Sequence, residues 1–186
     1  MLRTVLLLGL VLVASATDVV RHRIYNWTTY PGILAALGLN AAGSLAVRYG
    51  TIEESHLQSW GWIGLGESLW GGLICGLVML ACYVFFKVGG GDVKLVAMLG
   101  AFLGPEQGIL AMLWTFVLGA CMALIVLVWR VGPLRLLVRV LRQIVWMLRI
   151  GGWTPLTPDE RAQLQPPLFL APSALLAVIL VEFALF

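Results

Sequence analysis

The sequence predicts an all-α protein, a polytopic membrane bundle of about six transmembrane helices with an amphipathic helix on the cytoplasmic side. Composition is the first observation: 61% of the 186 residues are hydrophobic, 11% are charged, and mean hydropathy is +0.97. Soluble domains are about 45–50% apolar and about 25% charged, so this composition excludes a soluble enzyme, a disordered segment and a nucleic-acid-binding module. Apolar runs of membrane-spanning length and a one-sided distribution of Lys and Arg are the second and third observations.

Six apolar stretches are expected to form the bundle, in a single membrane-embedded domain covering residues 1–186. A span needs roughly 20 residues, so the chain leaves no room for a sizeable soluble domain. A turn is expected at Asn26–Tyr30, before the second apolar run, and a sharp turn at Gly104–Glu106, where Gly and Pro interrupt the apolar pattern. The expected spans are residues 4–23, 31–47, 69–88, 93–103, 108–129 and 168–186.

The first apolar run has an alternative interpretation as a secretory signal peptide. Arg3 precedes the run Thr4–Thr17, which ends in an Ala-Ser-Ala triplet typical of a cleavage site. The basic run at residues 21–23 follows at once, however, and favours a retained span with its end in the cytoplasm. We therefore expect a membrane helix that continues past Asp18.

The segment 130–153 combines arginines at helical spacing with large apolar residues. Such a pattern is typical of an amphipathic helix lying on the inner membrane surface. A tilted membrane helix with snorkelling arginines is the alternative. The residues Thr157–Glu160 after this segment predict a further helix start.

The positions of the cations predict the orientation of the bundle in the inner membrane. With six spans and both termini outside, ten of the twelve basic residues fall on the cytoplasmic side, and only Arg3 and Arg48 fall outside. The opposite orientation violates the positive-inside bias. The ten inner residues are Arg21, Arg23, Lys87, Lys94, Arg130, Arg135, Arg139, Arg142, Arg149 and Arg161.

Two acidic residues on the same side are candidates for catalysis. Asp18 and Asp92 each adjoin the cytoplasmic end of an apolar segment, where an ionisable group is costly and usually functional. If two such carboxylates share a water, repulsion keeps one protonated while the other activates the water for attack on a carbonyl. Two structural alternatives stay open. Asp92 could cap the helix 93–103, and Asp18 could be an interfacial residue paired with Arg21 or His22.

Other chemistries find little support in the sequence. The cysteines at 75, 82 and 121 form no C-x-x-C pair, and the histidines at 22 and 56 fall on opposite sides of the expected bundle. We therefore expect neither a metal site nor a cofactor, and no Ser has a plausible His/Asp pair nearby. Glycines at 89–91 would let the backbone bend and a substrate strand approach Asp92 closely.

The segments around Asp18 and Asp92 resemble the type IV prepilin peptidases, the GxGD family of membrane aspartyl proteases. Residues 89–95, GGGDVKL, match the family pattern G-x-G-D-x-K-L. The first-aspartate segment also resembles the family, with Asn26 matching and Tyr25 replacing the usual proline. The resemblance covers residues 10–130, and weakly the C terminus. The matching positions are Asp18 and Asp92, supported by Gly89, Gly91, Lys94, Arg21, Arg23 and Asn26.

The resemblance implies that Asp18 and Asp92 are a catalytic pair. The implied substrate is a prepilin or pseudopilin whose short basic leader is cut at the cytoplasmic face, before its hydrophobic helix. Longer family members carry an insert with paired C-x-x-C motifs and also methylate the new N terminus. This sequence resembles the minimal form without that insert, so methyltransferase activity is not expected.

Two other interpretations of the function remain. Presenilin-like or signal-peptide-peptidase-like intramembrane proteases also have a G-x-G-D motif, but usually a Tyr-Asp first motif and a Pro-Ala-Leu triplet. Here Thr17 precedes Asp18 and no such triplet occurs. A non-catalytic transport or secretion-assembly protein would use the aspartates in an ion pathway, but neither an internal repeat nor midplane charge is evident.

Overall fold

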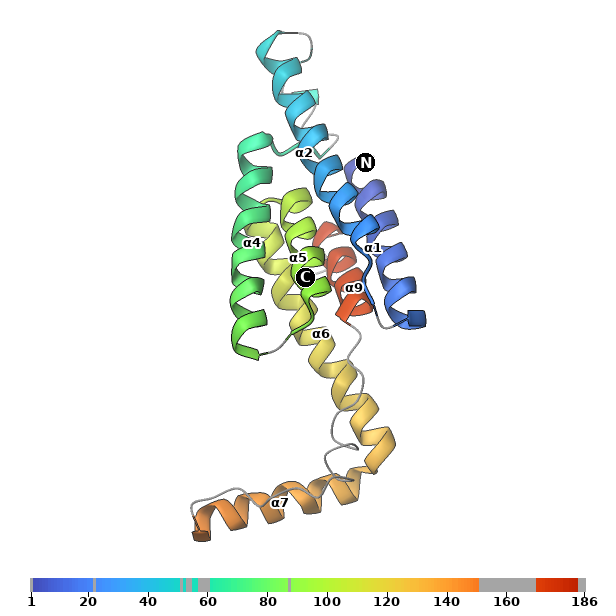
Figure 1. The fold of residues 1–186 in the computed structure, drawn as a ribbon, viewed down its shortest axis with the longest axis vertical. Helices are drawn as coiled ribbons and strands as arrows, with labels where there is room; N and C mark the ends of the chain where they lie inside the picture. The colour runs from blue at the N-terminus through green and yellow to red at the C-terminus, as the bar shows by residue number, and fades with distance from the viewer. Residues whose placement is uncertain are drawn as a thin grey trace. The chain divides into compact units, whose positions relative to one another are not determined.

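The computed structural model describes residues 2–21, 23–50, 52, 55–56, 61–86, 88–150 and 170–183. Within these ranges the regular secondary structure is entirely helical (Figure 1), which confirms the predicted all-α class. The chain divides into two compact units, and each is considered by itself. One unit contains residues Met1–Leu118 and Phe169–Phe186, and the other contains Gly119–Leu168.

Four helices in the described residues are long and apolar enough to cross a bilayer, as expected for a membrane protein. They are α1 (Leu2–Arg21), α2 (Asn26–Arg48), α4 (Leu65–Phe86) and α6 (Pro105–Val131). Two apolar helices are shorter than the roughly 20 residues of a full crossing. These are α5 (Gly90–Leu103), with 14 residues, and α9 (Leu170–Glu182), with 13.

Helix α5 lies at the centre of the first unit and supplies much of its core. It contacts α1, α2, α4 and α9, which explains why almost all of its second half is buried. Leu95, Met98, Leu99 and Phe102 are fully buried. A helix that is apolar on every side is the pattern expected for a buried position. Packing on several sides fixes the position of α5 and therefore of Asp92 in its first turn.

Glycines permit the closest helix contacts in this unit. A Cβ on Gly71 of α4 would overlap the carbonyl oxygen of Gly100 in α5, and the reverse is also true. A Cβ on Gly108 of α6 would lie 2.9 Å from the Gly100 Cα and 3.0 Å from the Cys75 sulfur of α4. Small residues at such contacts let helix backbones approach closely, which is the usual basis of packing within membranes.

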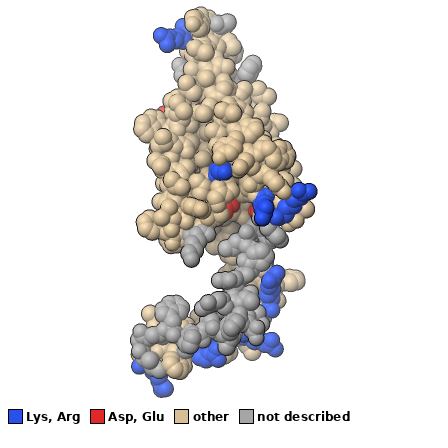
Figure 2. Space-filling view, viewed as in Figure 1, with Lys and Arg blue, Asp and Glu red and all other residues tan. Residues whose placement is uncertain are grey.

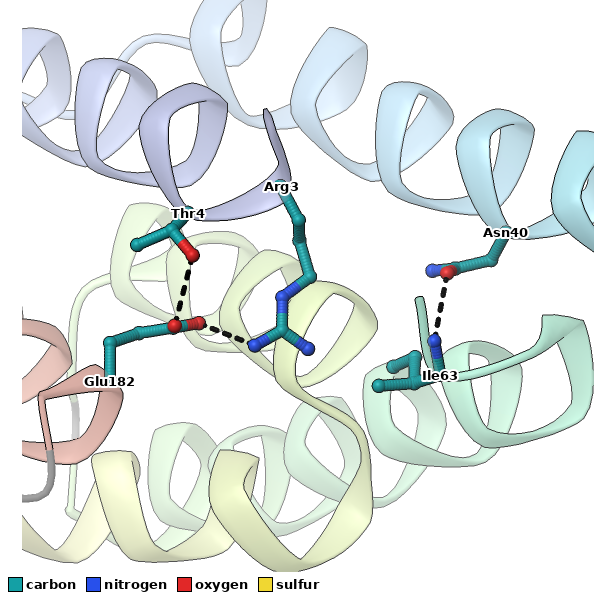
Figure 3. A network of polar contacts seen from close by, with 5 residues as sticks. All are labelled: Arg3, Thr4, Asn40, Ile63 and Glu182. Carbon is teal, nitrogen blue, oxygen red and sulfur yellow. Dashed lines mark hydrogen bonds and ion pairs between the residues drawn. The ribbon is translucent and has the colours of Figure 1, made fainter. Parts of the chain in front are cut away.

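Helices α1 and α9 run antiparallel and are joined by polar contacts at both ends. At one end Arg3 donates to the carboxylate of Glu182 at 2.7 Å, and Thr4 Oγ1 donates to the same carboxylate at 3.0 Å (Figure 3). The side chains of Arg3 and Glu182 are only 14% and 8% exposed. At the other end, the backbone N–H of Ala171 donates to Asp18 Oδ2 at 3.2 Å. The polar contacts at the two ends therefore hold α9 in register against α1.

Glu182→Gln is expected to lower the free energy of unfolding by about 3 kcal/mol, because it leaves a largely buried Arg3 without its counter-charge. Thermal unfolding in detergent, followed by tryptophan fluorescence, measures the change. Arg48→Gln is the matched control, since Arg48 is exposed at the end of α2. Equal midpoints for the two variants would show that the Arg3–Glu182 pair contributes nothing to stability.

The predicted turn at Asn26–Tyr30 is wrong. These residues form the start of α2, and Pro31 lies inside the helix. Thr28 Oγ1 donates to the Tyr25 carbonyl at 2.7 Å, which stabilises the helix start. Pro31 is the sixth residue of α2, so it removes one backbone hydrogen bond, the one to the Trp27 carbonyl, and the helix continues through it. The predicted turn before α6 is confirmed: Gly104 has a φ of 84° and Pro105 opens the next helix.

The second unit contains the end of α6 and the amphipathic helix α7 (Pro133–Ile150). This confirms an amphipathic helix within the expected segment 130–153, although residues 151–153 lie outside the described ones, as does the expected helix start at 157–160. Gly132, with a φ of 85°, separates the two helices, because a left-handed residue followed by Pro133 cannot continue α6.

Candidate active site

Asp18 lies in the last turn of α1 and is 7% exposed. Its carboxylate accepts the hydrogen bond from Ala171 N–H, which belongs to the first turn of α9. N–H groups in the first turn of a helix have no partner within the helix and readily bind a carboxylate. Two helices distant in the sequence therefore fix the position of this side chain.

Asp92 is the third residue of α5 and is half-buried. Gly89, in an extended conformation, is the N-cap of α5, so the helix begins at Gly90, three residues before the expected start at 93. The Asp92 carboxylate reaches back to the backbone N–H of Gly89, so it satisfies one of the free N–H groups at this helix start, as the capping alternative expects. A Cβ on Gly89 would lie 2.9 Å from Asp92 Oδ2, and glycine at this position leaves room for the carboxylate.

Asp18 and Asp92 lie close together at one end of the first unit. Their carboxylates are near enough to repel each other electrostatically when both are charged. They are 74 positions apart in the sequence, and the juxtaposition depends on α1 and α5 ending and beginning at the same level. Two carboxylates this close can share one proton and bind a water between them.

The connection between α1 and α2 packs against the first turns of α5. Ile24 lies against Gly91, where an added Cβ would come within 3.0 Å of the Ile24 Cβ. Lys94 Nζ donates to Asn26 Oδ1 at 2.8 Å and lies 4.9 Å from the centre of the Tyr30 ring. These contacts bring Gly91, Lys94 and Asn26 beside the aspartate pair and hold the connection in place.

Two further residues of the predicted site lie on the surface. Arg21 is exposed at the end of α1 and donates to the Tyr25 hydroxyl at 3.1 Å. Arg23 is exposed in the connection between α1 and α2. His22, the alternative partner of Asp18, lies outside the described residues. Figure 2 shows that few Lys, Arg, Asp or Glu residues lie on the visible part of the described surface.

Sequence reasoning missed the contribution of α9 to this site. Ala171 supplies a backbone N–H, and no side-chain pattern identifies such a group. The available signal was Pro172, because proline is favoured in the first turn of a helix and marks where free N–H groups lie. Among the residues that the structure describes, no group of three or more His, Cys, Asp or Glu side chains could hold a metal ion.

The fold and this site define a helical membrane protein with a pair of carboxylates at one end of its bundle. A model of the type IV leader peptidase family matches residues 5–124, which include both aspartates. The chain belongs to this family of peptidases. Comparison with curated proteins and with solved structures finds no match.

Proposed function

We propose that the protein is an aspartyl endopeptidase that removes the short basic leader from type IV pilin-like precursors. The observation that carries the proposal is the juxtaposition of Asp18 and Asp92 in a chain of the leader peptidase family. Metal and nucleophilic side-chain alternatives have no comparable cluster in the sequence. Neither a metal nor a cofactor enters the proposed reaction.

The proposed reaction uses the two carboxylates as a unit. One carboxylate is ionised and takes a proton from the bound water, whose oxygen attacks the peptide carbonyl. The protonated carboxyl donates to the developing oxyanion, and a proton then passes to the leaving amine as the C–N bond breaks. Water is consumed, and the products are the free leader and a pilin with a new N-terminal amine.

The position of the site suits a substrate anchored in the membrane. We place the aspartate pair at the cytoplasmic face of the inner membrane, with both termini outside, because this orientation puts most cations inside. A prepilin would present its leader junction there, just before its hydrophobic helix. Cleavage within a span, as in a presenilin-like protease, is the second candidate, and the position of the cut distinguishes the two.

The experiment is co-expression of the protein with a tagged prepilin, followed by intact mass measurement of the product. A single cut at the junction between the basic leader and the hydrophobic helix is expected. A cut within the hydrophobic helix would favour the intramembrane alternative. An unchanged prepilin beside well-expressed, membrane-inserted protein would contradict a peptidase acting on this substrate class and would favour a transport or assembly role.

Ala171→Pro is expected to slow leader cleavage about 10- to 100-fold, because it removes the N–H that positions Asp18 and small displacements of a catalytic group are costly. Proline is tolerated in a first helical turn, so α9 should still form. Ala171→Gly keeps the N–H and is the matched control. The rates are compared under single-turnover conditions, and equal cleavage by the two variants would exclude a positioning role for this contact.

A further inference from the structure

Helix α7 carries four arginines and no acidic residue. Arg135, Arg139, Arg142 and Arg149 follow one another at spacings of four, three and seven, which places them along one face of the helix. Like charges three or four positions apart destabilise a helix in water. The face would therefore be stabilised by a surface that carries many negative charges.

The opposite face of α7 is a continuous apolar stripe. Leu137, Val140, Leu141, Ile144 and Leu148 recur at the spacing of one helix face. Every one of these side chains is exposed, from 49% for Val140 and Ile144 to 81% for Leu148. A stripe of this extent is larger than the scattered apolar residues that a soluble surface normally shows. It identifies a face that is covered when the protein is in its working environment.

We propose that α7 lies along an anionic phospholipid leaflet, with the stripe in the acyl region and the arginines among the headgroup phosphates. A bilayer of this kind satisfies both faces at once. A second copy of the chain would cover the apolar stripe but would add a further row of positive charge. A transmembrane course would place four arginines in hydrocarbon, and α7 is not among the helices apolar enough to span.

The break before α7 fits an orientation that differs from that of α6. Gly132 and Pro133 end the apolar helix and start the basic one, so α7 is not obliged to continue along the same axis. α7 is 18 residues long, about 27 Å, which provides five helical turns for contact with the leaflet. The proposal concerns the lipid contact and does not depend on the peptidase activity.

The test uses the full chain in liposomes, with Cys75, Cys82 and Cys121 replaced by alanine. A nitroxide is attached at Ile144→Cys on the stripe or at Gln143→Cys, its neighbour on the polar side. Collisions with oxygen, which concentrates in lipid, and with a water-soluble nickel chelate report the position of each label. Phosphatidylcholine is compared with a mixture of phosphatidylcholine and phosphatidylglycerol.

With phosphatidylglycerol present, the label at 144 is expected in the acyl region and the label at 143 in water. Arg135→Gln, Arg142→Gln and Arg149→Gln together should lower the ratio of bound to free α7 about 100-fold, since each arginine contributes about fivefold. High salt should also lower the ratio of bound to free α7, because it screens the attraction between the arginines and the phosphates. Three results would overturn the proposal. The label at 144 could be buried equally with and without phosphatidylglycerol, its burial could increase with protein concentration, or the label at 143 could be buried to the same extent.

Discussion

Asp18→Asn and Asp92→Asn are each expected to reduce leader cleavage by at least about 10³-fold. Removing one member of a catalytic unit disables the whole unit, because the remaining carboxylate can no longer divide the roles of base and acid. Asparagine has nearly the same shape as aspartate and can still accept the hydrogen bonds from Ala171 N–H and Gly89 N–H. The loss should therefore come from chemistry and not from unfolding.

The measurement is the mass shift of a tagged prepilin co-expressed with each variant. Thermal unfolding of the purified variants in detergent should match the wild-type protein within a few degrees. Glu67→Gln is the matched control, because it neutralises an acid in the first turn of α4, outside the aspartate site. Cleavage at the wild-type rate by either asparagine variant would remove that aspartate from the proposed mechanism.

Gly71→Ala and Gly100→Ala are expected to lower the free energy of unfolding by about 3 kcal/mol each. An added methyl group on either residue overlaps the backbone of the facing helix, and Cys75 Cβ would lie 2.8 Å from a Cβ on Gly100. The clash cannot be relieved by rotating a side chain, so α4 and α5 must separate. Cleavage should decrease as well, since α5 carries Asp92.

Gly66→Ala provides a close control for this packing. Gly66 also lies in α4, but a Cβ there meets nothing within 4 Å. Alanine favours a helix by about 1 kcal/mol over glycine, so this variant should be as stable as the wild-type protein or slightly more stable. Thermal unfolding in one detergent compares all three variants. Similar midpoints for Gly66→Ala and Gly71→Ala would show that the close contact does not limit stability.

The sequence was sufficient to predict the class of fold and the approximate position of every helix described. Apolar runs of span length and the arginine spacing carried that information, because both follow directly from the solvent properties of a bilayer. Helix starts were less accurate. Helix α2 begins at Asn26, five residues before its proline, and the loss of one hydrogen bond at Pro31 does not end it.

The site could be predicted only in part. Asp18 and Asp92 were identifiable because an ionisable side chain near or inside a bilayer is costly and usually functional, and the G-x-G-D motif marked the second. Their proximity depends on how α1, α5 and α9 pack, which is a property of many small contacts such as Gly71 against Gly100. The contact between Ala171 N–H and Asp18 involves the backbone alone, and a sequence pattern does not record it.

The most direct test of the aspartate pair is the single-turnover cleavage rate of the double variant Asp18→Asn/Asp92→Asn beside the two single variants. The measurement uses excess purified protein in liposomes with a prepilin substrate and long incubation. If the carboxylates act as one unit, the double variant cleaves no more slowly than the slower single variant. A further loss equal to the product of the two single effects would show independent contributions and contradict the shared-water mechanism.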